Sequence, residues 1–106
     1  MYRGQLERKR KQRVDAERKA GEYRAKESKH RTDAAKAAQA ASKTKSVATM
    51  NSKRREADRR EKDAATAGAE AARWQSRASG YAREEASIAS KLARRARGAG
   101  RHSASG

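Results

Sequence analysis

Three clusters of lysine and arginine are the side chains of this sequence with the clearest chemistry. Phosphate groups attract such clusters, and counterion release makes the attraction fall steeply with salt. The candidate polyanion contacts are Arg8, Lys9, Arg10, Lys11, Arg13, Lys53, Arg54, Arg55, Arg94, Arg95 and Arg97. They favour weak, nonspecific binding of nucleic acid, although no nucleic-acid-reading motif accompanies them. The alternative interpretation is a solvated helix face.

The remaining polar residues do not form a recognisable catalytic or metal-binding pattern. The chain has no cysteine, and its histidines, His30 and His102, are far apart, whereas a metal site needs several ligands. The sequence also lacks a glycine-rich phosphate loop and a serine nucleophile elbow. We therefore expect no enzyme activity, no cofactor, no metal and no small-molecule ligand.

The composition limits the size of any hydrophobic core. Among 106 residues there are one Trp, three Tyr, two Met and no Phe, and 40% of the residues are charged. Alanine supplies most of the apolar side chains, and burying one alanine methyl group gains only about 0.8 kcal/mol. The abundant Ala, Arg, Lys, Glu and Gln are strong helix formers, and proline is absent. This composition favours a coiled coil or long helix over a disordered chain.

Two heptad registers cover most of the chain. The a and d positions of the first, in residues 5–41, are Leu6, Lys9, Arg13, Ala16, Ala20, Tyr23, Glu27, His30, Ala34, Ala37 and Ala41. Those of the second, in residues 50–92, are Met50, Lys53, Ala57, Arg60, Ala64, Ala67, Ala71, Trp74, Ala78, Tyr81, Glu85, Ile88 and Leu92. Such a repeat places one stripe of each helix against another helix. The polar members of the first stripe must lie at an end, form pairs or reach water.

Trp74, Tyr81 and Ile88 are large residues that recur at heptad spacing in the second register. Small alanines alternate with them and let a partner helix approach closely. The predicted helix-packing seam consists of Ala64, Ala67, Ala71, Trp74, Ala78, Tyr81, Ile88 and Leu92. Base stacking is the alternative role for Trp74 and Tyr81. The nearest candidate partner is the chain's own 5–41 arm, and we also expect self-association or pairing with another coiled-coil protein.

The two registers do not join in residues 42–51, a segment rich in Ser, Thr and Asn. These side chains favour turns and helix caps, and Asn51 or Ser52 is the expected cap of the second helix. We predict an all-α, elongated antiparallel helical hairpin or coiled coil, with arms at 5–41 and 52–92 and a connector at 42–51. The alternative is one long helix with a register slip, because no Gly or Pro marks a turn.

Residues 93–106 differ in character from the helical coiled-coil region 1–92. They contain no acidic residue, three glycines and no heptad periodicity, which predicts a disordered basic tail. The seam also stops abruptly at Leu92. We hypothesise that the natural coiled coil continued and that this end is truncated or frameshifted. Another reading frame of the downstream DNA would then continue the heptads.

The net charge of +16 predicts affinity for polyanions. The first residues lack the apolar run of a secretory signal. No stretch approaches the roughly 20 apolar residues that a membrane span requires. The default expectation is a cytoplasmic protein without a membrane span.

The segments Met1–Lys11, Ala72–Gln75 and Gly80–Glu85 resemble the amino-terminal coiled-coil region of larger, Streptomyces-type actinobacterial multidomain proteins. The resemblance covers about residues 1–92, and the sequence departs from it after Leu92. It implies a scaffolding or oligomerising leader to other domains. We therefore expect a non-catalytic protein–protein interaction or scaffolding coiled coil, with nonspecific nucleic-acid binding as the alternative function.

Overall fold

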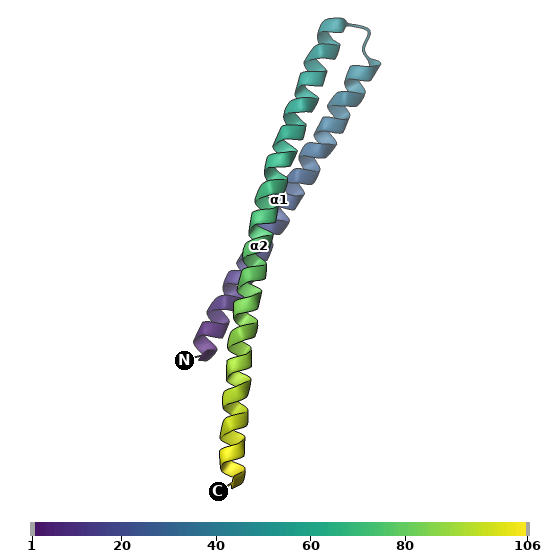
Figure 1. Ribbon diagram of the computed structural model, residues 1–106. Helices are drawn as coiled ribbons and strands as arrows, with labels where there is room; N and C mark the ends of the chain where they lie inside the picture. The colour runs from purple at the N-terminus through teal and green to yellow at the C-terminus, as the bar shows by residue number, and fades with distance from the viewer. Residues whose placement is uncertain (1, 106) are drawn as a thin grey trace. The chain divides into compact units, whose positions relative to one another are not determined.

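The computed structural model describes residues 2–105, and it describes side chains for residues 2–98. The chain forms helix α1, Tyr2–Lys43, and helix α2, Val47–Ser105, with no strand in the described part (Figure 1). The predicted all-α helical hairpin is confirmed, and the alternative of one long helix is wrong. Neither helix in residues 2–105 has the long apolar run that crossing a membrane requires.

Residues 44–46 connect the helices, so the connector is shorter than predicted. Ser46 caps α2, because its Oγ accepts a hydrogen bond from the backbone N–H of Thr49 at 3.4 Å. The backbone N–H of Met50 donates to the carbonyl oxygen of Ser46 at 2.9 Å. A serine cap therefore starts α2 without glycine or proline. The predicted caps, Asn51 and Ser52, lie inside α2 instead.

Contacts between the helices divide the chain into two compact units. Unit 1 combines Met1–Glu17 with Gln75–Gly106, and unit 2 is Arg18–Trp74. In unit 2, the later part of α1 and the first part of α2 run antiparallel on either side of the connector (Figure 1). In unit 1, Tyr2 meets Arg95 and Arg13 meets Glu85. The helix segments of unit 1 are therefore antiparallel as well.

The predicted a and d positions form the interior of both units. Alanines and one isoleucine are buried: Ala20, Ala34, Ala37, Ala41, Ala64, Ala67 and Ala71 in unit 2, and Ala16, Ala78 and Ile88 in unit 1. The other predicted a and d residues are half-buried, and none of these predicted positions is exposed. The heptad explains this result, because residues seven apart return to nearly the same face of a helix.

The end of α2 lies beyond the predicted heptads. α2 continues to Ser105, where the sequence predicts a disordered tail over residues 93–106. Ala93–Arg97 contains only alanine and arginine, which are among the strongest helix formers. Residues 93–98 are exposed, so helix propensity rather than burial accounts for the helix there.

Candidate functional site

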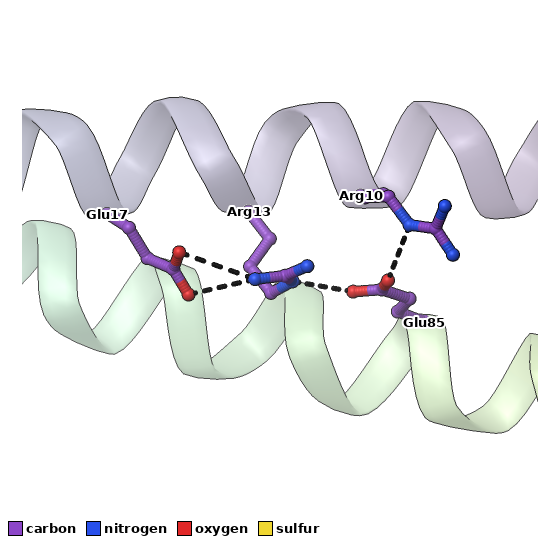
Figure 2. Close-up of polar contacts among 4 residues, drawn as sticks. All are labelled: Arg10, Arg13, Glu17 and Glu85. Carbon is purple, nitrogen blue, oxygen red and sulfur yellow. Dashed lines mark hydrogen bonds and ion pairs between the residues drawn. The ribbon is translucent and has the colours of Figure 1, made fainter.

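Unit 1 contains a polar network between its helices, centred on Glu85 of α2 (Figure 2). Arg13 Nε donates a hydrogen bond to Glu85 Oε2 at 2.7 Å, and Arg10 Nε donates to Glu85 Oε1 at 3.3 Å. Arg13 Nη1 also donates to Glu17 Oε1 at 3.1 Å, so Arg13 bridges carboxylates on both helices. Arg13 and Glu85 occupy predicted a and d positions, and helix packing therefore brings them together.

This network shifts the pKa values of both seam residues. The hydrogen bond from Arg13 is the main cause that lowers the pKa of Glu85; burial opposes it, and the hydrogen bond from Arg10 adds to it. The pKa of Arg13 is raised, mainly by its hydrogen bond to Glu85 and then by that to Glu17. The charges of Arg13 and Glu85 are thus each matched by an opposite charge. A shift in helix register would separate them and leave polar groups of the seam unpaired.

Lys9 makes a second connection between the helices of unit 1. Its Nζ lies 2.6 Å from Glu84 Oε2 and 5.7 Å from the centre of the Tyr81 ring. Such a cation over a ring face is attracted by the electron density of the ring. Tyr81 is therefore engaged by a lysine of α1, as the seam prediction implies.

Two predicted a and d residues of unit 2, Trp74 and Glu27, also contact charged side chains. Lys19 Nζ lies 4.3 Å from the centre of the Trp74 ring. Glu27 Oε2 accepts a hydrogen bond from Arg31 Nη2 at 3.1 Å. The same carboxylate occupies the space that a Cβ atom would need at Gly68 of α2. The missing side chain of Gly68 therefore makes room for a charged seam residue of α1.

The candidate polyanion contacts fall into two groups. Those that contact other side chains are Lys9, Arg10, Arg13, Lys53 and Arg95. Those that are exposed and have no side-chain partner among the described residues are Arg8, Lys11, Arg54, Arg55, Arg94 and Arg97. The first group contributes to the fold, and the second group is available to a ligand.

An open groove of about 350 Å³ lies in unit 1 and is lined by Gln5, Arg8, Lys9, Gln12 and Ile88. Lys91 and Arg94 are exposed and follow Ile88 by three and six residues in α2, so basic residues continue along the helix beyond the groove. We refer to Arg8, Lys9, Lys91 and Arg94, around Ile88, as the basic groove. The amide oxygen of Gln12 is buried and has no hydrogen-bond partner among the described residues.

Sequence reasoning did not identify Glu84, Gln5, Gln12 or Lys91 as site residues. The sequence contains one signal that points to Lys91: no acidic residue follows Glu85. The groove itself depends on which residues of α1 face Ile88, and a single sequence does not contain that alignment. In the described part of the chain, no three His, Cys, Asp or Glu side chains are grouped so that they could hold a metal ion.

Comparisons with protein-family models, with curated proteins and with solved structures give no match for this chain. The resemblance to Streptomyces-type coiled-coil regions stays a prediction. A functional proposal therefore depends on the helix packing and on the charged surfaces of the two units.

Proposed function

We propose that the chain is a non-catalytic helical scaffold whose charged outer faces contact other proteins. The observation that supports this proposal most is the burial of the heptad positions within the chain's own units. Every predicted a and d residue is buried or half-buried. Each unit thus fills its apolar seam internally, which leaves the charged faces of α1 and α2 for partners.

The Trp74, Tyr81 and Ile88 stripe contributes to this internal packing. Ile88 is 9% exposed, and lysines lie over the rings of Trp74 and Tyr81. Among the described side chains, the exposed large hydrophobic residues are Val14 and Val47. Self-association through the stripe would therefore require the helix pairs to open first. We expect partners to contact the charged faces instead.

Sedimentation of the wild type and of Trp74→Ala tests this proposal. We expect monomers in both cases, because the ring of Trp74 packs within unit 2. The substitution should lower the free energy of unfolding by about 2 kcal/mol, less than for a fully buried tryptophan, since Trp74 is half-buried. Gln75→Ala, at the exposed neighbouring position, should change it by less than about 0.5 kcal/mol. A wild-type dimer that Trp74→Ala converts to a monomer would contradict the proposal.

A further inference from the structure

We propose that the basic groove of unit 1 binds the phosphate backbone of double-stranded nucleic acid. This inference is independent of the scaffold proposal and does not require a protein partner. The groove is lined by Arg8 and Lys9 of α1 and by Ile88 of α2, and Lys91 and Arg94 follow Ile88 along α2 in the same unit. Two of the three basic clusters of the sequence therefore lie in unit 1.

The charge around the basic groove is almost entirely positive. Residues 86–98 of α2 contain no acidic residue, and Glu7 is the one acidic residue in residues 3–11 of α1. Arg8, Lys91 and Arg94 are exposed and have no ion-pair partner among the described residues. Their charge is therefore available to an external anion.

The acidic residues that precede this segment of α2 are already engaged. Glu84 pairs with Lys9, and Glu85 pairs with Arg10 and Arg13. The ion pairs of the helix interface thus use the carboxylates that would otherwise compete with a ligand. Packing of the two helices leaves a local surplus of positive charge at the groove.

A groove in unit 2 provides a contrast. Its volume is about 300 Å³, and its charged lining residues are Asp33, Lys36, Lys53, Glu56 and Arg60. Two carboxylates among these residues offset much of the positive charge. The middle basic cluster of the sequence therefore lies in mixed surroundings, and the groove of unit 1 is the better polyanion surface.

The contacts of the aromatic residues favour the nucleic-acid backbone over the bases. Arg95 lies 5.7 Å from the centre of the Tyr2 ring, and Lys9 lies over Tyr81. Recognition of single strands uses aromatic rings on which bases stack, whereas phosphate contacts need only positioned cations. Both tyrosines in this unit are engaged by cations, so a duplex that offers phosphates is the favoured ligand.

The size and polarity of the surface also fit a duplex. Residues 88–94 span about 9 Å of helix, and duplex DNA carries one charge per about 1.7 Å of axis, so several phosphates come within reach.

Binding in a membrane interface requires a helix with an apolar face. The exposed large hydrophobic residues of the described part, Val14 and Val47, do not line the groove.

Fluorescence anisotropy with a labelled, mixed-sequence DNA duplex tests the proposal on the full-length chain. The test variant carries Arg8→Gln, Lys91→Gln and Arg94→Gln together, because glutamine removes the charge and keeps helix propensity. The matched control carries Arg54→Gln, Arg59→Gln and Lys62→Gln, which removes the same number of charges from exposed positions of unit 2. Circular dichroism establishes that both variants keep the helix content of the wild type.

We expect the test variant to bind the duplex about tenfold or more weakly than the wild type at 0.1 M salt, and the control variant to remain within about threefold. The slope of log affinity against log salt should fall by about 2 to 3 in the test variant, since each lost phosphate contact removes about 0.9. Equal losses of duplex affinity in the test variant and the control variant would overturn the proposal, because net charge alone would then account for binding.

Two further probes separate the duplex from other polyanions. One probe is a vesicle that contains phosphatidylserine, and the other is a poly-glutamate peptide. Each is titrated separately under the same conditions. Clearly weaker binding of both than of the duplex would support the proposal. Binding of either probe as tightly as the duplex would overturn it, as would the absence of duplex binding by the wild type at 0.1 M salt.

Discussion

At the scale of single residues, Glu85 of α2 connects to two arginines of α1 in unit 1. It accepts hydrogen bonds from Arg13 at 2.7 Å and from Arg10 at 3.3 Å. Its side chain is 16% exposed, so loss of the arginine partners would leave a carboxylate with little water around it. Glu85 therefore favours one alignment of α1 against α2 over shifted alignments.

The pKa shift of Glu85 predicts a dependence of stability on pH. Its pKa is lower in the folded chain than in the unfolded chain, where a glutamate titrates near pH 4.3. The folded state thus binds fewer protons, and the contribution of Glu85 is fully present above the unfolded pKa and is lost as pH falls through the folded pKa. We expect the melting temperature of Glu85→Gln to be below that of the wild type at pH 7, with the difference shrinking below pH 4.

Glu61→Gln is the control for this pH series. Glu61 is exposed and has no ion-pair partner among the described residues, so its removal should leave the pH profile close to that of the wild type. Thermal denaturation at several pH values, followed by circular dichroism, measures all three proteins. If the difference in melting temperature between the wild type and Glu85→Gln stayed constant from pH 7 to pH 3, the assigned role of the carboxylate would be contradicted.

At the scale of the helices, alanine rather than leucine builds the interface. Ala71 is 0% exposed, whereas its neighbour Ala72 is exposed. Because a side chain as small as alanine lets helices approach closely, the space around Ala71 has no room for a longer side chain. Adjacent alanines with identical helix propensity thus have different roles.

Leucine substitutions measure this difference. Ala71→Leu should lower the free energy of unfolding by about 1 to 3 kcal/mol, because added methylene groups overpack the seam. Ala72→Leu should change it by less than about 0.5 kcal/mol. Urea denaturation followed by far-ultraviolet circular dichroism measures both. If Ala71→Leu were as stable as Ala72→Leu, the close packing of α1 and α2 at this position would be disproved.

The helices and their faces were predictable because they follow from local geometry. The heptad positions of both registers, from Leu6 to Leu92, are the buried and half-buried positions of the structure. The cap at Ser46 was less predictable, because the segment from Ser42 to Ser52 offers many serine, threonine and asparagine side chains that can start a helix. The end of the heptads at Leu92 was also visible in the sequence, and the residues of α2 that follow it are exposed up to Gly98.

The candidate site was predictable only in part, since its residues come from both helices. Arg8, Arg94 and Arg97 were identified as candidate polyanion contacts because they are basic residues within clusters. The pairing of Lys9 with Glu84 and of Arg13 with Glu85 depends on how the helices are aligned. Periodicity identifies which face is buried, but it leaves open which residue of the partner helix lies opposite.

At the scale of the whole molecule, the net charge of +16 is unevenly distributed along the chain. Acidic residues alternate with basic residues in much of the chain, but residues 34–55 contain none and none follows Glu85. The end of α2 therefore adds only positive charge to unit 1. The heptad positions thus provide a seam that is filled within the chain. The acid-free end of α2 provides a basic surface.

The two helices fill their seams against each other within a single chain. Lys9→Cys combined with Glu84→Cys tests this packing directly, because these residues form an ion pair between the helices and the protein has no other cysteine. Lys11→Cys combined with Glu84→Cys is the control, since Lys11 is exposed on another face of α1.

Both double variants are treated with a short bismaleimide at a series of protein concentrations and analysed by denaturing electrophoresis and mass spectrometry. We predict that the Lys9/Glu84 variant gives a cross-linked monomer in high yield at every dilution, and that the Lys11/Glu84 control gives much less. Cross-links that form only between chains, and that disappear on dilution, would contradict the pairing of α1 with α2 in the same chain.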